Sequence, residues 1–201
     1  MDNPNDPFLL QLGKYEHHRK VFMEPIPAYF QKLKQNLASM PNTTFVNAAI
    51  SSTPGGDAEE SGHSSKATAV MYCVQNDTDK QAGLPFWADQ ICSFSREHIT
   101  KLLPNATVES VEVELLTVRQ MLQQHDISDV LVVLIDTEGF DWQVVRQLPL
   151  HHASFRPVLI GFENQHLSAG DLAAAVDFLH GHGYAVMHDS KTLNTFALAM
   201  S

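Results

Sequence analysis

The stretch 130–142, VLVVLIDTEGFDW, decides the fold of this chain. Residues 130–135 are all Val, Leu or Ile, a run that is too short to span a membrane and rich in β-branched side chains, so it predicts a strand buried on both faces. Such a strand is typical of the centre of a parallel sheet. The run ends in Asp136 and Glu138 beside Gly139, and a helical pattern follows at once. The sequence therefore predicts two carboxylates at the carboxyl edge of a central strand, where open α/β sheets bind ligands.

Length and composition are those of a globular protein. The chain has 201 residues, of which 44% are hydrophobic and 18% charged, and we expect a single domain over 1–201 that buries about 70% of its unfolded surface. The formal charge of −10 argues against binding to nucleic acid or to an anionic membrane, because both need a basic surface. No apolar run is long enough for a transmembrane helix and no basic leader precedes an apolar segment, so we expect a cytoplasmic protein.

The chain has two cysteines, Cys73 and Cys92. Two are too few for a disulfide framework, and they lack metal-ligand spacing. We predict buried free thiols, which fits a reducing compartment.

Hydrophobic periodicity predicts strands that alternate with helices. Strands are predicted at 8–12, 21–23, 44–50, 67–74, 108–116, 130–135, 157–162, 184–187 and 195–199. Helices are predicted after Pro25, over 95–103, from Thr117 with a capping box to Gln120, after Trp142, and from a cap at Asp171.

This alternation predicts an α/β fold with a mostly parallel sheet and helices on both faces. The last two strands suit a C-terminal antiparallel hairpin. The strand at 108–116 alternates imperfectly, so we interpret it as an exposed or edge strand. Residues 51–66 are rich in Ser, Gly, Asp and Glu without apolar periodicity, which predicts a flexible loop.

Four acids follow predicted strands. Glu24 comes after the strand at 21–23, Asp136 and Glu138 after the central strand, and Glu163 after the strand at 157–162. Because parallel strands present their carboxyl ends to one crevice, we expect these carboxylates to share a rim. Glu24 could accept hydrogen bonds from ribose hydroxyls or be a solvated strand-end acid. Asp136 and Glu138 could serve a site or cap the following helix.

Eleven histidines invite a metal interpretation. The adjacent pairs at 17–18 and 151–152 point apart and lack a matched carboxylate, so the sequence predicts no metal site there. His166 and His188 lie just beyond predicted strand ends, where a role in substrate binding or proton transfer is conceivable.

Several segments together resemble the FkbM-type family of S-adenosylmethionine-dependent methyltransferases. The most specific is VVLIDTEGFDWQVVRQL at 132–148, with a Glu-Pro pair upstream in VFMEPIPAYFQKLKQNL at 21–37. The others are TFVNAAIS at 44–51, LTVRQML at 116–122, PVLIGFE at 157–163 and the closing GYAV at 183–186. These pieces run in the same order as in the family over nearly the whole chain.

The resemblance implies a Rossmann-like fold, S-adenosylmethionine as cofactor, and methyl transfer to a hydroxyl of a small molecule or sugar. It implies that Glu24 takes the ribose hydroxyls and that Asn47, Ala48 and Ala49 lie by the adenine end. Gly13 would belong to the cofactor loop.

At the methyl-transfer end, the resemblance implies that Asp136 and Glu138 face the reacting groups, with Asp136 also close to the cofactor. His166 joins them as the third candidate catalytic residue. A carboxylate there could orient or deprotonate the acceptor hydroxyl, while the protein aligns nucleophile, methyl and sulfur.

The chain departs from the family at its beginning. Family members follow the first strand with a Gly-rich loop and a helix, whereas here only the eight residues 13–20 join the strands at 8–12 and 21–23. A crossover that contains a helix needs about a dozen residues. The first helix is therefore predicted to be missing, which shortens the cofactor loop and would impair cofactor binding.

Three hypotheses follow from the sequence. The first is an S-adenosylmethionine-dependent O-methyltransferase with a shortened cofactor loop. The second is a catalytically inactive module that keeps the fold and binds a partner, because a missing helix would leave an apolar sheet face uncovered. The third and weakest is a metal-dependent hydrolase built from Asp136, Glu138, Glu163 and His166.

Overall fold

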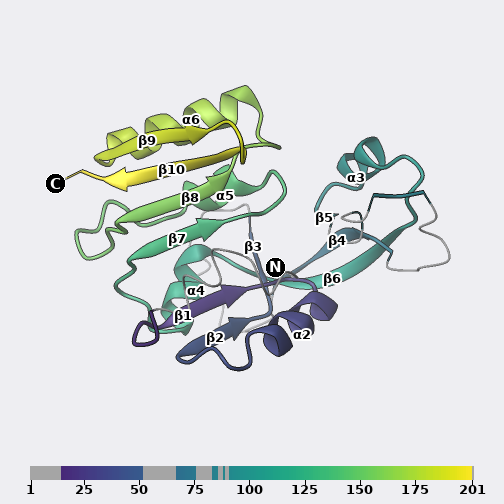
Figure 1. The fold of residues 1–201 in the computed structure, drawn as a ribbon, viewed down its shortest axis with the longest axis horizontal. Coiled ribbons are helices and arrows are strands. Elements are labelled where there is room, and N and C mark those ends of the chain that lie inside the picture. Colours follow the sequence, from purple (N-terminus) through teal and green to yellow (C-terminus); the bar gives the residue numbers. More distant parts are fainter. Residues whose placement is uncertain (1–14, 52–66, 76–82, 86–87, 89–90, 201) are drawn as a thin grey trace.

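The computed structural model describes residues 15–51, 67–75, 83–85, 88 and 91–200 (Figure 1). The strands of this part are β1 (Lys20–Met23), β2 (Thr43–Val46), β3 (Ala49–Ile50), β4 (Thr68–Val74), β5 (Cys92–Ser93), β6 (Val108–Leu116), β7 (Val132–Ile135), β8 (Leu159–Glu163), β9 (Tyr184–Asp189) and β10 (Asn194–Ala199). The helices are α2 (Pro27–Asn36), α3 (Arg96–Leu102), α4 (Val118–Gln124), α5 (Asp141–Val145) and α6 (Ala169–Gly181).

The described strands form three sheets, of which the two four-stranded ones are mixed and the two-stranded one is parallel. Their orders are β1-β2, β7-β8-β10-β9 and β3-β6-β4-β5. Of the seven pairings, β1–β2, β3–β6 and β7–β8 are parallel and the other four are antiparallel. The α/β class agrees with the sequence, but the described part does not confirm the prediction of a mostly parallel sheet. The antiparallel β9–β10 hairpin is present where the sequence predicts it.

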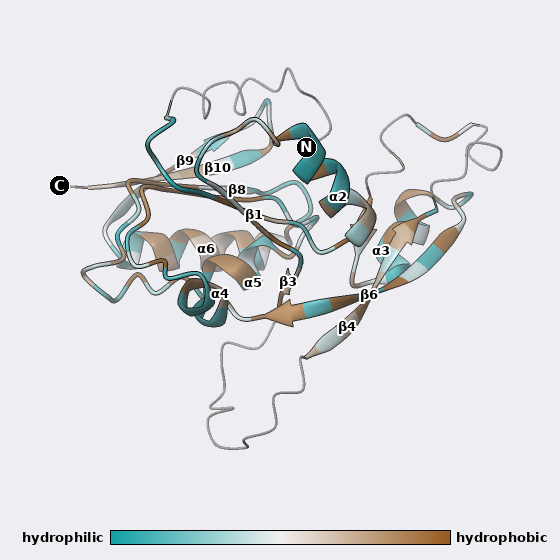
Figure 2. Cartoon of the chain, turned by 90° about the horizontal axis from the view of Figure 1, so that it is seen from below, coloured by the Kyte–Doolittle hydropathy of each residue, from teal (hydrophilic) through white to brown (hydrophobic). Residues whose placement is uncertain are grey.

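The largest core lies between the C-terminal sheet and its helices. Helices α4, α5 and α6 lie on one side of these strands (Figure 2). Side chains that alternate along the strands point to this side, and each inner strand contributes to it: Ile160 and Phe162 from β8 and Ala197 from β10 pack with Val145 and Leu179 from the helices. A smaller core joins β1 to α2.

Strand β7 is not buried on both faces, contrary to the expectation from its apolar run. Ile135 is buried, but Val132 is 39% and Leu134 40% exposed. Among the described strands, β7 pairs with β8 alone and is the outermost one of this sheet. Among the described residues, the helices cover the face toward which Ile135 points, and an unbroken apolar run does not reveal this difference between the two faces.

The single strand predicted at 44–50 is wrong, because the chain forms two strands there. β2 pairs with β1, and β3 pairs with β6 in another sheet. Between them, the Asn47 side-chain amide donates to the backbone carbonyl oxygens of Glu24 and Pro25 at 2.9 and 3.0 Å. These long-range hydrogen bonds hold the crossing point between the two sheets.

Strand β6 is not an edge strand. It pairs antiparallel with the whole of β4 and, through Leu115 and Leu116, parallel with β3. Its apolar residues alternate imperfectly because most of the strand is exposed or half-exposed. Only Val113 and Leu116 are buried. β4 and β6 extend together to the part of the molecule that carries α3 (Figure 1).

The prediction of free thiols is also wrong. Cys73 on β4 and Cys92 on β5 are directly opposite in the antiparallel register and form a disulfide. The pairing depends on a strand register between segments 19 residues apart, which periodicity does not specify. The argument for a reducing compartment that rested on free thiols therefore falls.

Local helix signals are largely confirmed. Ser95 caps α3 by accepting from the His98 backbone N–H, and Thr117 and Gln120 form a complete capping box at α4. The cap of α6 is Ser168 rather than Asp171, because the Ser168 hydroxyl accepts from the Asp171 backbone N–H at 3.0 Å.

Some expectations fall outside the described residues. These are the strand at 8–12, Gly13, and the loop at 51–66 apart from Ser51. Of the short connection before β1, residues 15–19 form a turn that leads directly into the strand, with no helix in that described stretch.

Candidate functional site

The candidate site lies where β7 and β8 end. The two strands are parallel, and Ile135 is opposite Phe162 in the register. The next residues, Asp136 and Glu163, are therefore neighbours at the carboxyl edge, as the sequence predicts. The arrowheads of both strands point toward the side of the molecule on which α3 lies (Figure 1).

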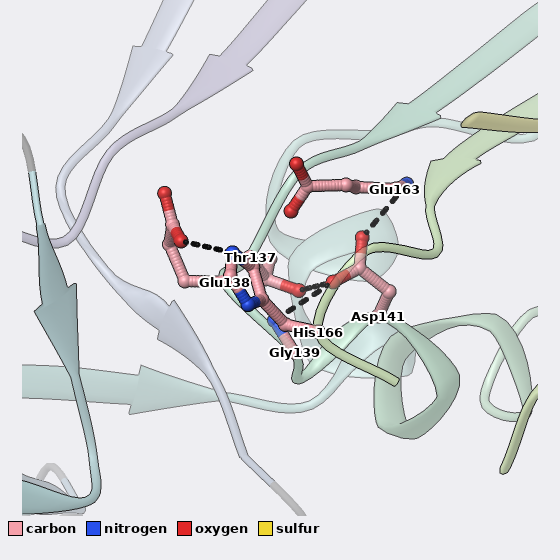
Figure 3. A network of polar contacts seen from close by, with 6 residues as sticks. All are labelled: Thr137, Glu138, Gly139, Asp141, Glu163 and His166. Carbon is pink, nitrogen blue, oxygen red and sulfur yellow. Dashed lines mark hydrogen bonds and ion pairs between the residues drawn. The ribbon is translucent and has the colours of Figure 1, made fainter. Parts of the chain in front are cut away.

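Asp141 ties the two strand ends together. It is completely buried at the start of α5. One carboxylate oxygen accepts from the Thr137 hydroxyl at 2.9 Å and the Gly139 N–H at 3.3 Å, and the other accepts from the Glu163 N–H at 3.2 Å (Figure 3). Burial raises the pKa of Asp141, and the hydrogen bond from Thr137 opposes that rise. The turn after β7 is thus fixed to the end of β8.

Glu138 and His166 face each other across this turn. Glu138 has a φ of 53°, in the left-handed region that few residues other than glycine adopt. Its Oε2 lies 3.4 Å from His166 Nε2, and the side chains of His166 and Glu138 are only 15% and 27% exposed (Figure 3). Gly139, with a φ of 95°, lets the backbone of the turn pass close to His166, since a Cβ at this position would lie 3.1 Å from His166 Cβ.

Burial and mutual repulsion raise the pKa values of two of the acids, Glu138 and Glu163, close to neutral pH. Burial raises the pKa of Glu138 to about 7, and the charges of Asp136 and Asp141 raise it further. Burial likewise raises the pKa of Glu163 to about 7, with added repulsion from Asp136, Glu138 and Asp141. Three of the four acids expected on one rim therefore act on one another electrostatically, together with Asp141.

His166 is held as a weak base. Burial lowers its pKa, the charge of His98 lowers it further, and Asp136 opposes both effects. The His98 ring, from α3, meets the His166 ring edge-on with centroids 5.2 Å apart. Because the imidazole is mostly neutral at pH 7, its contact with Glu138 is a polar contact between two groups that can each accept a proton. Such groups can take a proton from a bound hydroxyl near neutral pH.

The alternative role of Asp136 and Glu138 as helix caps is wrong. The N-cap position of α5 is Phe140, and no side chain forms a capping hydrogen bond there. Instead, Asp136 is exposed at the strand end and Glu138 contacts His166.

The residues expected at the cofactor lie around the ends of β1 and β2. Glu24 follows β1, is half-buried, and accepts from the Ile26 N–H through Oε1 at 2.8 Å. The Asn47 side-chain amide donates hydrogen bonds to the backbone carbonyl oxygens that follow β1. Ala48 and Ala49 are buried, with 1% and 6% of their surface exposed.

His188 does not lie beyond a strand end as expected. It is part of β9, and its Nδ1 is 2.9 Å from the Thr195 hydroxyl, which also accepts from the Asn164 amide at 2.8 Å. His188 thus belongs to a hydrogen-bonded chain across β9 and β10 rather than to the group formed by Glu138, Glu163 and His166.

Sequence reasoning missed two residues of the site. Asp141 was one of the acids in the deciding stretch, but its complete burial depends on β8 lying beside the turn. His98 lies in α3, about 70 residues before His166 in the chain. No local pattern signals its contact, because only the tertiary fold brings α3 to the end of β8.

The described part is an α/β protein with an acidic turn after β7 at the carboxyl edge of its C-terminal sheet. The family model of the FkbM methyltransferase domain matches residues 5–186, and the chain therefore belongs to this family. Neither a search of curated proteins nor a search of solved structures found a match. Among the described residues, none of the helices has the length and apolar character needed to cross a membrane.

The described residues suit the cofactor that the family implies. A carboxylate at the end of a strand is the acceptor that ribose hydroxyls require, and Glu24 occupies that position beside the parallel end of β2. The contribution of Gly13 lies outside the described residues.

Proposed function

We propose that this chain is an S-adenosylmethionine-dependent O-methyltransferase that acts on a hydroxyl of a small molecule or sugar. The observation that carries the proposal is the contact between Glu138 and His166 at the carboxyl edge. A half-buried carboxyl with a pKa of about 7 lies beside a neutral imidazole, which is the arrangement required to accept a hydroxyl proton at neutral pH.

The chain's own residues would bind, orient and deprotonate. When bound, the cofactor supplies a methyl group on a sulfonium sulfur. Glu24 would hold the ribose hydroxyls, with the backbone of 47–49 at the adenine end. Glu138 or His166 would accept the proton of the acceptor hydroxyl, and Asp136 would orient the acceptor from the end of β7. Alignment of these groups is the main source of rate in such a transfer.

Calorimetric titration with S-adenosylhomocysteine tests the cofactor site. We expect one-to-one binding by the full chain and a loss of more than about tenfold in affinity in Glu24→Ala, because the ribose contacts are removed. Glu112→Ala is the matched control, since Glu112 is exposed on β6. Equal affinity in Glu24→Ala and the wild type would contradict the assigned role of Glu24, and absence of binding in a folded wild type would contradict the proposed function.

Methyl transfer to a panel of sugars and small alcohols tests the base. We expect Glu138→Gln and His166→Gln to lower kcat by about 10²-fold or more, in the range of general-base catalysis. Their affinity for S-adenosylhomocysteine should be unchanged, because neither residue is placed at the cofactor. Full activity in both variants would show that neither Glu138 nor His166 acts as the base.

A second candidate function is supported by an exposed apolar row on the C-terminal sheet. Leu134, Gly161, Phe196 and Met187 are successive neighbours across β7, β8, β10 and β9. Leu134 and Met187 are 40% and 55% exposed, on the face opposite to the helices. Contiguous exposed apolar side chains favour protein–protein contact, as in a non-catalytic module that binds a partner.

Sedimentation and binding of a hydrophobic dye test this second candidate. A partner-binding module should bind the dye or self-associate, and Met187→Gln should weaken either behaviour. Lys191→Gln, on the exposed turn between β9 and β10, is the control. A monomer that binds no dye would count against this function.

A further inference from the structure

Glu138, Glu163 and His166 bring three possible metal ligands to one place. Glu138 lies on the turn after β7, Glu163 is the last residue of β8, and His166 lies on the loop before α6 (Figure 3). One oxygen or nitrogen from each side chain can be chosen so that all three atoms lie within 4.8 Å of one another. Two carboxylates and one imidazole form a donor set that divalent metal ions accept.

The spacing of the donors agrees with metal coordination. Bonds of about 2.0–2.2 Å to oxygen and nitrogen place neighbouring ligand atoms of a tetrahedral ion about 3.4 Å apart. Glu138 Oε2 and His166 Nε2 are already separated by 3.4 Å. A carboxylate oxygen of Glu163 lies within 4.8 Å of both atoms, so a small side-chain movement is needed to complete the set.

An independent observation concerns the second oxygen of Glu163. Oε2 of Glu163 is a buried atom that has no hydrogen-bond partner within the described part of the chain. A buried carboxylate oxygen without a donor is costly, and a bound cation would satisfy it. Burial of this oxygen beside two further donors favours a ligand of positive charge.

The three donors are also held on a rigid support. Asp141 fixes the turn that carries Glu138 to the backbone of Glu163 through the hydrogen bonds described above. The loop of His166 packs directly against Gly139. Glu138 itself has a left-handed backbone conformation, and such strained positions persist where the surrounding structure holds them, which is often at functional sites.

We infer that Glu138, Glu163 and His166 bind one divalent metal ion through Glu138 Oε2, a carboxylate oxygen of Glu163 and His166 Nε2. The imidazole ligand favours Zn²⁺ over Mg²⁺, since Mg²⁺ prefers oxygen donors and retains its water. Three protein ligands leave coordination positions open. On the proposed methyltransferase function, those positions would bind the acceptor oxygen and lower the pKa of its hydroxyl, and with the metal bound Glu138 and His166 would act through it rather than as the base. The metal site itself does not rest on that function.

Calorimetric titration of the tag-free, chelator-treated full chain with ZnCl₂ tests the site. We expect one Zn²⁺ per chain, with affinity reduced more than about tenfold in Glu163→Gln and in His166→Gln. Glu112→Gln, an exposed acid on β6, should bind like the wild type, and MgCl₂ should bind more weakly. Circular dichroism of each variant verifies that it is folded, and His166→Gln serves if Glu163→Gln does not fold.

The inference is overturned if the wild type binds no Zn²⁺, or if both ligand variants bind it as tightly as the wild type. Titration with S-adenosylhomocysteine in the same samples separates the two proposals. Binding of S-adenosylhomocysteine without Zn²⁺ binding would overturn the metal site and leave the methyltransferase proposal standing. If the variants weaken Zn²⁺ binding and the protein does not bind S-adenosylhomocysteine, the metal site stands and the methyltransferase proposal is contradicted.

Discussion

The carboxylate of Asp141 accepts a hydrogen bond from the backbone N–H of Glu163 at 3.2 Å, across the ends of two parallel strands. With its bonds to Thr137 and Gly139, this contact makes one buried side chain the link between the turn after β7 and the end of β8. Asp136, Glu138, Glu163 and His166 all lie on one of these two segments or on the loop that follows β8. The geometry of the site therefore depends on a residue that would not itself touch a substrate.

Replacing Asp141 by Ala should lower the free energy of unfolding by about 2 to 4 kcal/mol, because three donors lose their acceptor and two of them are backbone N–H groups. Asp141→Asn should lose less, since one oxygen remains as an acceptor. Urea unfolding followed by circular dichroism measures both losses. Asp177→Ala, at an exposed position of α6, is the control, and an Asp141→Ala variant as stable as this control would contradict the structural role of Asp141.

Gly139→Ala should destabilise the protein by about 1 to 3 kcal/mol, because alanine is strained at a φ of 95° and its Cβ would lie 3.1 Å from His166 Cβ. Gly181→Ala is the matched control. Apart from its chain neighbours and the backbone of its own helix, nothing lies within 4 Å of the added Cβ at this last residue of α6, so the control should be neutral or stabilising by up to about 1 kcal/mol. Thermal unfolding compares them, and equal midpoints would show that the turn tolerates a side chain.

Much of the fold could be predicted because its signals are local. The Ser95 cap, the Thr117–Gln120 capping box and strand β8 each follow from a few neighbouring residues. Strand pairing could not be predicted in the same way. The stretch 44–50 looks like one strand, and it divides because Asn47 bonds to backbone more than 20 residues away. The Cys73–Cys92 pairing likewise depends on the register of β4 with β5.

The candidate site could be predicted in outline for a physical reason. Acids at the ends of parallel strands must lie at one edge, so Asp136, Glu138 and Glu163 were expected together, and His166 was expected near them. The burial that shifts the pKa values of Glu138 and Glu163 depends on three-dimensional packing and has no sequence pattern. The same holds for the contact of His98 with His166.

The stability of the metal-free protein should depend on Glu163 between about pH 4.5 and 7. The folded state raises the pKa of Glu163 from 4.5 to about 7, so between these values the folded protein binds more protons than the unfolded one. The stabilisation is full below pH 4.5 and is lost as the pH rises through 7. Relative to the wild type, Glu163→Gln should therefore gain stability between pH 5 and pH 8.

The expected gain is about 1 to 2 kcal/mol, after allowance for solvent screening and for sharing of the effect with Glu138. Urea unfolding at pH 5 and pH 8 with a chelator present measures it. Glu112→Gln provides the reference for an exposed acid. A difference between Glu163→Gln and the wild type that is the same at both pH values would show that the folded state does not raise the pKa of Glu163.

Removing the charge of His98 should raise the pKa of His166. Burial is the larger cause of the low pKa of His166, and the charge of His98 is the second. His98→Phe keeps an aromatic ring against His166, so we expect a rise that stays below the ordinary value of 6.5 because burial remains. His98→Ala also opens the site to water and should raise the pKa of His166 further.

Titration of the imidazole signals by NMR distinguishes the two causes, with His180→Ala on the exposed side of α6 as the control. If the pKa of His166 is identical in the wild type and both His98 variants, His98 neither repels the charged form of His166 nor keeps water away from it.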